Sequence, residues 1–406
     1  MTTLTIERLG QQGDGVARGP VFVPLALPGE VVSGNLAGDT LEDVRIESPS
    51  SDRVAAPCSH FRSCGGCQLQ HASDDLVATW KRDTIVTALA VHGLETDVRP
   101  TLTSPDRSRR RATFAARRTK KGAMVGFHAR KSGAIIPIPN CILVTPALAA
   151  VPPVAEALAM VGASRKAALS VTVTDSIEGL DISVTGGKPL DGPLRIGLAG
   201  VCEAHRLARL TWDDELIGMR VPPAQPMGVA RVVPPPGAFL QATHHGQETL
   251  TALVQEIVGD AKSVVDLFAG CGTFALPLAE TAEIHAVEGD DTMLAALDAG
   301  WRQAQGLKLV TTSARDLFRR PLLPDELRKF GAAVIDPPRA GATAQIAELA
   351  QAKVPKIAHV SCNPQTFARD ASTLINAGYT LEWVQPVDQF RWAAHVELVG
   401  SFRLTS

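Results

Sequence analysis

The chain of 406 residues is 45% hydrophobic and 20% charged, which is enough apolar material for two or three domains with separate cores. Its net charge of −2 and single tyrosine exclude binding of nucleic acid by overall basic charge or through an aromatic-rich surface. The first ten residues lack the basic and apolar parts of a secretory signal, and the apolar stretch 145–163 contains two prolines and Glu156. We therefore expect a cytoplasmic protein that does not enter membranes.

Residues 1–56 contain four short strand-like segments separated by glycine-containing turns, a pattern typical of a small β-barrel. Residues 76–93 carry apolar side chains at helical spacing and end at Gly93, which predicts a helix. We place this helix in a segment, 70–101, that packs on the last domain. From 102 to 235, strand-like and helix-like patterns mix up to a triple proline, and this predicts a central α+β domain.

A cluster of cations lies inside this central region. Ten of the residues from Arg107 to Lys131 are Lys or Arg, whereas residues 1–56 contain eight acidic residues and four Arg. A solvated surface is the common explanation of such a run, but in a slightly acidic protein it also predicts a local surface for anions. We expect phosphate contacts here and not on the barrel.

Cysteine spacing indicates a further kind of site. The seven cysteines are an odd number, which in a cytosolic chain favours metal binding or catalysis over a disulfide framework. Cys58, Cys64 and Cys67 follow a C-x5-C-x2-C pattern, and Cys141 lies 74 residues further on. Four thiolates can hold a zinc ion or a [4Fe–4S] cluster, and a single C-x2-C pair favours the cluster. Unrelated reduced thiols are the alternative, above all for Cys141.

After residue 235, buried strand-like runs alternate with helix-like segments, which predicts βαβ units and a parallel sheet. The first strand leads into a loop with Gly270 and Gly272, which lets the backbone approach a nucleotide closely. Glu288 ends the second strand, where a carboxylate can accept hydrogen bonds from ribose hydroxyls, and Asp316 follows the third strand, beside the expected adenine. Helix capping is the alternative role of both acids. This end of the sheet suits either NAD or S-adenosylmethionine.

Two reactive side chains stand at the ends of the next strands. Asp336 ends the fourth strand before two prolines, and Cys362 ends the fifth before Asn-Pro. Because the carboxyl ends of parallel strands share one edge of the sheet, we expect both to face the nucleoside. Residues 391–399 look like a further strand that carries Glu397. A Cys nucleophile and a carboxylate base beside a methyl donor indicate addition–elimination chemistry, whereas a core Cys and a surface Glu are the alternative.

The motifs FLQ, DLFAGCGTF, DPPRAG, HVSCNPQTFARD and HVE occur in this order in the last domain. Together they resemble the RNA uridine C5-methyltransferase family. The resemblance implies that the Cys362 thiolate adds to C6 of a uracil, that S-adenosylmethionine supplies a methyl group to C5, and that Glu397 removes the C5 proton. The resemblance also implies which residues bind the cofactor: Phe268, Thr273, Glu288 and Asp316 match cofactor-binding positions. Gln241 and Asp336 match positions at the junction of cofactor and target base.

The N-terminal part of the chain resembles one branch of this family. Its first segment is similar to a TRAM domain, a small OB-like barrel that binds RNA, and the cysteine spacing matches the rRNA-specific members, in which it implies a [4Fe–4S] cluster. The chain departs from the family pattern at Thr273, where Asn is common, and at Thr243. Arg391 and Trp392 also replace a proline-containing stretch before Glu397.

We therefore predict an α/β chain with a TRAM-like barrel at 1–56, a central α+β Fe–S and RNA-binding domain at 57–69 and 102–235, and a Rossmann-like class I methyltransferase domain at 236–406. The predicted function is S-adenosylmethionine-dependent C5 methylation of uridine in 23S rRNA through a covalent adduct of Cys362 with C6. The predicted ligands of the [4Fe–4S] cluster are Cys58, Cys64, Cys67 and Cys141.

Three alternatives accompany this prediction. A tRNA uridine methyltransferase is the nearest, although the tRNA-specific bacterial members usually lack the cluster and the barrel. An amino-group methyltransferase that uses the DPPR segment, and a noncatalytic RNA-binding Fe–S protein, are the other two. The expected partner is RNA, and the sequence indicates no obligate protein partner.

Overall fold

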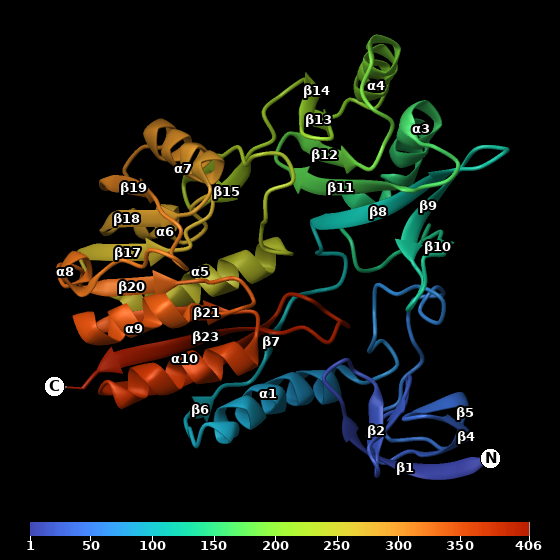
Figure 1. Ribbon diagram of the computed structural model, residues 1–406, viewed down its shortest axis with the longest axis horizontal. Coiled ribbons are helices and arrows are strands. Elements are labelled where there is room, and N and C mark those ends of the chain that lie inside the picture. Colours follow the sequence, from blue (N-terminus) through green and yellow to red (C-terminus); the bar gives the residue numbers. More distant parts are fainter. Residues whose placement is uncertain (406) are drawn as a thin grey trace.

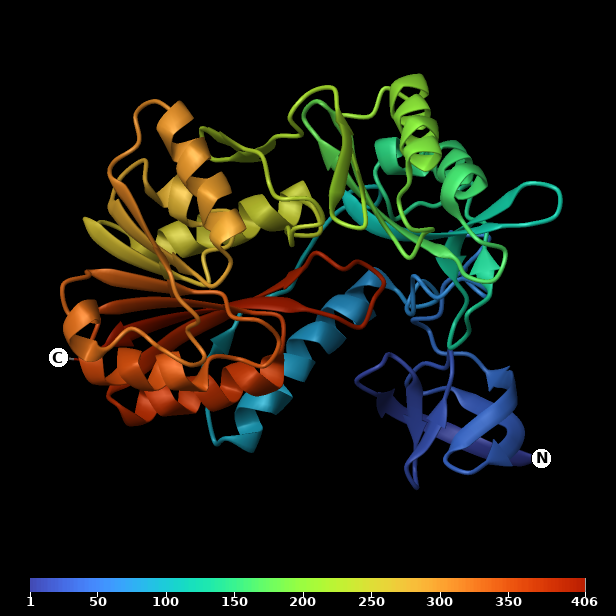
Figure 2. The ribbon, with the colours of Figure 1, turned by 45° about the horizontal axis from the view of Figure 1, so that its top comes forward.

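Four β-sheets organise residues 1–405, which are the residues that the computed structural model describes (Figures 1 and 2). They are a closed barrel near the N-terminus, a seven-stranded sheet in the middle of the chain, a two-stranded ribbon and a nine-stranded sheet at the C-terminal end. Within these residues, every helix is either too short or too polar to cross a lipid bilayer.

The N-terminal barrel confirms the barrel predicted from the pattern of strands and turns. Its strands are β1 (Thr2–Leu9), β2 (Gly15–Ala17), β3 (Val21–Val23), β4 (Val31–Ala37) and β5 (Thr40–Ser48). They pair in the order β1-β2-β3-β5-β4, and β4 returns to β1, so the sheet closes. A Cβ at Gly34 would lie 2.4 Å from the carbonyl oxygen of Glu42, so glycine is required where β4 and β5 meet. The buried carboxylate of Glu30 pairs with Arg53 Nε at 2.5 Å, which ties the barrel to the next segment.

The central sheet has the strand order β10-β9-β8-β11-β12-β13-β14, with α2, α3 and α4 packed on it (Figure 1). Its strands are β8 (Arg111–Arg118), β9 (Ala123–His128), β10 (Ile135–Ile136), β11 (Leu169–Ser176), β12 (Gly179–Thr185), β13 (Arg209–Trp212) and β14 (Glu215–Met219). The helices are α2 (Pro146–Ala149), α3 (Pro152–Gly162) and α4 (Gly192–Ala204). All neighbours are antiparallel except β12 and β13, which run parallel. One apolar core joins the helices to the sheet, so the mixed α+β character predicted for this region is observed.

The C-terminal sheet has the order β19-β18-β17-β20-β21-β23-β22-β6, and β7 also pairs with β22. Its strands are β17 (Ser263–Leu267), β18 (Glu283–Glu288), β19 (Val310–Ala314), β20 (Ala332–Ile335), β21 (Lys356–Ser361), β22 (Tyr379–Asp388), β23 (Glu397–Leu404), β6 (Asp97–Val98) and β7 (Leu102–Thr103). The strands β17 to β21 are parallel, and β23 is antiparallel to both of its neighbours. The five parallel strands are those predicted from the buried runs.

Helices cover both faces of this sheet, which confirms the Rossmann-like prediction. One face packs on α5 (His244–Val258), α6 (Ala275–Leu278) and α7 (Asp291–Gln303). The other packs on α1 (Asp74–Val91), α8 (Pro324–Leu327), α9 (Thr343–Ala352) and α10 (Pro364–Asn376). Adjacent strand residues serve opposite faces: Val264 belongs to the first core and Val265 to the second.

Three stretches differ from the sequence-based expectation. The ribbon of β15 (Gln225–Met227) and β16 (Ala230–Val232) packs with α7 in a core of the C-terminal sheet, although it precedes the expected boundary at 235. Likewise β7 pairs with β22, although it follows the boundary at 102. The strand expected from residue 391 begins only at Glu397, so that prediction was wrong for 391–396. These residues turn the chain from β22 into its antiparallel neighbour β23, a reversal that an extended strand cannot make.

Candidate active site

All eight residues that the sequence analysis assigned to catalysis or cofactor binding line one cavity of about 650 Å³. The cavity lies where β17, β18, β20 and β21 end, at the carboxyl edge of the parallel strands, and its volume suits a ligand of nucleoside size. The eight residues are Gln241, Phe268, Thr273, Glu288, Asp316, Asp336, Cys362 and Glu397.

One end of the cavity is built from backbone held by Glu288. Its carboxylate accepts hydrogen bonds from the N–H groups of Gly270 at 3.0 Å and Gly289 at 2.7 Å, so the loop after β17 is fastened to the end of β18. Gly272 has φ +93°, and a Cβ there would lie 2.9 Å from Leu297 Cγ, so this turn requires glycine. Phe268 also has a positive φ of +63°, a strained conformation for an aromatic residue. Backbone strain of this kind concentrates at ligand sites.

Two aromatic rings on the rim were missed by the sequence analysis. Phe318 is 50% exposed, lines the cavity and lies 5.4 Å from the ring of Phe268, and Phe239 is 63% exposed at the cavity beside Gln241. Exposed rings at the mouth of a cavity are suited to stacking on planar ligands. Phe239 is the first residue of the FLQ motif, from which only Gln241 was assigned a role, whereas Phe318 is a single aromatic residue in a loop that no sequence pattern distinguishes.

The other end of the cavity presents Cys362 between a strand and a helix. The residue follows the last residue of β21, and Asn363 caps α10 by accepting a hydrogen bond from the N–H of Gln365 at 3.1 Å. Pro364 begins the helix, where its missing N–H costs nothing. The side chain is thus half-buried in the cavity wall and held by regular structure on both sides.

Three acidic groups crowd this end. Burial raises the pKa of Asp336 to about 7, and burial together with Asp336 raises the pKa of Glu397 to about 8. Burial, Glu397 and Asp336 raise the pKa of the Cys362 thiol to about 11, against a smaller opposing effect of Arg339. Each group disfavours ionisation of the next, so a bound cation would favour the thiolate and the carboxylates.

Comparison with known proteins agrees with this geometry. Residues 235–402 match the family described as tRNA (Uracil-5-)-methyltransferase. Over 98% of both chains, the protein is 46% identical to one from Rhizobium meliloti that is named as an RNA methyltransferase. Across 99% of this chain and 95% of the relative, it is 30% identical to the 23S rRNA (uracil(1939)-C(5))-methyltransferase RlmD of a Shewanella species. The chain belongs to the RNA uracil-C5 methyltransferase family.

A solved structure shares the fold of this methyltransferase. The tRNA (uracil-54, C5)-methyltransferase of Pyrococcus abyssi, in complex with S-adenosyl-L-homocysteine, matches with a TM-score of 0.76 and 21% identity over 98% of this chain and 99% of the other. The shared fold agrees with the family shown by the relatives, and by that family the protein is an S-adenosylmethionine-dependent RNA methyltransferase of the uracil-C5 type. This family assignment argues against the amino-group methyltransferase and against the noncatalytic RNA-binding protein.

The buried Glu397 of the methyltransferase carries a stability cost that depends on pH. Its pKa is about 8 in the folded enzyme and 4.5 ordinarily, so the folded state binds the proton more tightly, and stability falls as pH rises from 4.5 to 8. We expect Glu397→Gln to leave the melting temperature unchanged near pH 5 and to raise it at pH 8–9. The free energy of unfolding at pH 8–9 should increase by up to about 5 kcal/mol. Thermal melts across this pH range measure the difference.

The matched control for this prediction is Glu382→Gln on β22. Burial alone would raise the pKa of Glu382, but hydrogen bonds from Arg403 and Ser401 together lower it. The ionised Glu382 carboxylate stabilises the folded protein above pH 4.5. The control Glu382→Gln removes this charge and should therefore lower the melting temperature at neutral pH. If Glu397→Gln raised the melting temperature equally at pH 5 and at pH 9, the idea that burial raises the pKa of Glu397 would be contradicted.

The loop from Gln389 to Val396, which delivers Glu397, is held at several points. At its start, Asp388 forms a fully buried ion pair with Lys81 of α1, with Oδ1 and Nζ 2.6 Å apart. At its centre, the carbonyl oxygen of Trp392 accepts hydrogen bonds from the N–H groups of Gln68 at 2.7 Å and Leu69 at 3.0 Å. The Trp392 side chain, which departs from the family pattern, is itself buried in an apolar cluster with Phe61, Cys67 and Leu143.

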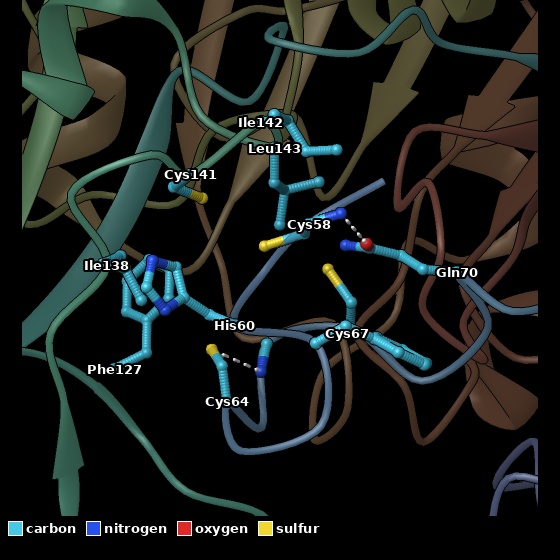
Figure 3. A pocket seen from close by; sticks show the side chains of 12 residues that line it. Cys58, His60, Cys64, Cys67, Gln70, Phe127, Ile138, Cys141, Ile142 and Leu143 are labelled. Carbon is cyan, nitrogen blue, oxygen red and sulfur yellow. Dashed lines mark hydrogen bonds between the residues drawn. The ribbon is translucent and has the colours of Figure 1, made fainter. Parts of the chain in front are cut away.

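The four cysteines predicted to bind metal line a second, small pocket (Figure 3). Cys58, Cys64 and Cys67 come from the loop before α1, and Cys141 comes from the loop after β10, with its sulfur turned toward theirs. All four are free thiols, and the N–H of Gly66 donates to Cys64 Sγ at 3.4 Å. Within residues 1–405, no group of three or more His, Cys, Asp or Glu side chains is close enough to hold a metal ion.

The basic run 107–131 does not form one phosphate-binding face, so that expectation was wrong in part. Arg110 is fully buried and donates to the carbonyl oxygen of Gln241 at 3.1 Å and to Gln247 Oε1 at 2.7 Å. Arg130 donates to the carbonyl oxygen of Cys67 at 2.5 Å. Arg110 thus joins the central region to residues 241–247, and Arg130 fastens the cysteine-containing loop to the turn between β9 and β10. The cations left at the turn of the β8–β9 hairpin, which projects from the molecule in Figure 1, are Arg117, Arg118, Lys120 and Lys121.

Proposed function

We propose that the enzyme methylates C5 of a uridine in 23S rRNA through a transient bond between Cys362 and C6 of the base. The observation that carries the proposal is the meeting of Cys362 and Glu397 in one cavity whose other end has the Gly-rich loop and the carboxylate of a nucleoside site. A uridine must leave its stack to reach this cavity, so an unpaired or unstacked region is the expected target.

Cys362 acts first. As a thiolate, Sγ forms a bond to C6, and the electrons of the C5–C6 double bond move toward C5 and O4 as an enolate. Bound S-adenosylmethionine supplies an electrophilic methyl group, and its positive sulfonium favours the charged forms of Cys362 and Asp336. C5 takes the methyl group, and the electrons of the broken S–C bond stay on the sulfur of the leaving thioether.

Glu397 completes the reaction. Its carboxylate accepts the C5 proton, the electrons of the C5–H bond restore the C5–C6 double bond, and Cys362 leaves C6 as a thiolate. Asp336 lies beside both groups, at the junction of nucleoside and base. Phe268, Thr273, Glu288 and Asp316 would hold the cofactor, with Glu288 on the ribose and Asp316 beside the adenine.

The choice of 23S rRNA rests on two features. The relative that acts on 23S rRNA matches almost the whole length of the chain, including the cysteine-containing segment and the barrel. The proposed RNA-binding parts are the barrel at 1–56 and the projecting β8–β9 hairpin, whose four cations suit phosphate contacts.

Methyl transfer from labelled S-adenosylmethionine to separately purified rRNA and tRNA tests the proposal. We expect label in 23S rRNA, and mass spectrometry of its nucleosides should show 5-methyluridine. Cys362→Ala serves as the control for background transfer. Label in tRNA alone would favour the tRNA alternative, and a methyl group on an amino nitrogen would overturn the mechanism.

We further propose that Cys58, Cys64, Cys67 and Cys141 hold a [4Fe–4S] cluster. A tetrahedral zinc site would bring its sulfurs to about 3.8 Å from one another, given a Zn–S distance of about 2.3 Å. In a cluster each thiolate binds a different iron, so the thiolates surround a common space, and the four cysteines in Figure 3 surround one pocket. The apolar lining from Phe127, Ile138 and Leu143 and the N–H donor to Cys64 also suit a cluster.

Metal analysis of protein purified without oxygen checks this assignment. We expect about four iron and four sulfide per chain, with absorbance near 400 nm that dithionite bleaches. Cys67→Ser should lose most of the iron, whereas Cys202→Ser, in α4 of the central region, should keep it. One zinc per chain and no iron would contradict the cluster.

A further inference from the structure

Gln389 is a buried residue to which neither the sequence motifs nor the proposed mechanism assigns a role. It is the first residue after β22 and is only 2% exposed. Its position is closely determined, because Asp388 is fixed by Lys81, and a Cβ at Gly246 would lie 2.7 Å from Gln389 Cβ. Only glycine at 246 leaves room for this side chain.

The orientation of the Gln389 amide follows from one backbone contact. The N–H of Ala242 can only donate, and it points at Gln389 Oε1 at 2.7 Å. The NH2 group of Gln389 therefore faces the other way and donates to Gln241 Oε1 at 2.5 Å. Because the oxygen of Gln241 is engaged in this bond, its own NH2 group is left for the cavity that Gln241 lines.

Glu397, which lines the same cavity as Gln241, is the second polar neighbour of the Gln389 side chain. A side-chain hydrogen bond from Gln389 lowers the pKa of the Glu397 carboxyl, against the larger effects of burial and of Asp336, which raise it. Two other ionisable groups are near this carboxyl, Cys362 at the end of β21 and His395 in the same loop. Arg339 lowers the pKa of both. The NH2 group of a neutral amide carries two hydrogens, so it can donate to Gln241 and to Glu397 without adding charge.

We propose that Gln389 is a positioning residue that holds Gln241 and Glu397 in register across the cavity, so that Gln241 presents N–H donors to the bound ligand and Glu397 presents an acceptor to C5. The inference rests on the proposed function for its meaning in catalysis. The arrangement itself stands on the hydrogen bonds of Gln389 with Ala242 and Gln241 and on the cavity that Gln241 and Glu397 both line.

Two variants test the role in catalysis. Gln389→Met removes all polar atoms at similar length, and Gln389→Glu keeps the acceptor for Ala242 while removing the donors. We expect kcat to fall on the order of 10²-fold in both, with a higher KM for S-adenosylmethionine and a rise in the pH at which kcat/KM reaches half its maximum. RNA adducts should accumulate, since proton removal slows. Gln385→Leu is the matched control, because the side-chain NH2 group of this buried Gln of β22 donates to the carbonyl oxygens of Pro100 and Pro386. It should change stability without moving the pH profile.

A measurement without RNA separates this inference from the proposed function. In thermal melts, Gln389→Met should lower the melting temperature more at pH 9 than at pH 5, because the ionised Glu397 loses its donor. In a Glu397→Gln background this pH dependence should vanish. An unchanged pH profile together with a pH-independent effect on melting would overturn the inference and leave the methyltransferase function standing. Absence of methyl transfer by the wild-type enzyme would overturn the function alone, because the melts still decide the role of Gln389.

Discussion

Cys362→Ala is expected to abolish methyl transfer, with a loss of activity on the order of 10⁴-fold or more. In the proposed mechanism, the addition of the Cys362 thiolate to C6 makes C5 nucleophilic, and alanine offers no group that can form this bond. Binding of S-adenosylmethionine should persist, because the nucleoside end of the cavity is built from β17 and β18. Steady-state kinetics and calorimetric binding of the cofactor measure the two effects separately.

Transcripts that contain 5-fluorouridine provide the direct readout of the same bond. Fluorine at C5 cannot be removed as a proton, so the adduct should persist and migrate as an RNA–protein complex under denaturing conditions. Wild-type enzyme and Cys202→Ala should both form it, and Cys362→Ala should not. A complex of unchanged yield in Cys362→Ala would place the nucleophile elsewhere.

Glu397→Gln is expected to retain addition and methylation but to stall before release. Without a base for the C5 proton, kcat should fall roughly 10²- to 10⁴-fold, and a covalent complex should accumulate on unmodified RNA. The amide has the same shape as the protonated carboxyl, so the buried site accommodates it. Denaturing gels with labelled RNA detect the complex, and mass spectrometry of the bound nucleotide should show the added methyl group.

Glu382→Gln on the neighbouring strand is again the control, since this residue pairs with Ser401 and Arg403 outside the cavity. Its turnover should equal that of the wild type. Full turnover of Glu397→Gln would mean that another group takes the proton. In that case Asp336, the other carboxyl at this end of the cavity, becomes the candidate.

The cavity itself was predictable because its residues follow short-range rules. Parallel strands must place their carboxyl ends on one edge, so Glu288, Asp336 and Cys362 were expected to meet, and they do. The Gly-rich turn and the Asn-Pro helix start are likewise properties of a few consecutive residues. Glu397 was named as a candidate base from a strand-like segment and then matched to the family's base, but no periodicity indicated its place in the cavity.

The prediction of a phosphate-binding surface from the basic run 107–131 was wrong in part, because neighbouring residues in the sequence do not decide which side chains become buried. Ten cations close together suggested a phosphate surface, yet Arg110 lies in the interior, where it binds a backbone carbonyl and Gln side chains from residues 225–247. A sequence records the charge of each residue but not the element that will pack over it. The sequence likewise did not show that the apolar residues of the β15–β16 ribbon would pack in the core under α7.

The amino-acid sequence by itself determined the alternation of strands and helices, the barrel, the edge of the sheet that holds the cavity, and the residue types at its reacting end. Only the tertiary structure decided how the loop 389–396 is held, because its partners lie in α1, in the segment after Cys67 and at residues 241–242. Hydrogen bonds between residues about 150 to 320 positions apart leave no periodic trace in a chain, since they depend on how separate elements pack. That packing, and not any motif, sets the position of the Glu397 carboxyl in the cavity.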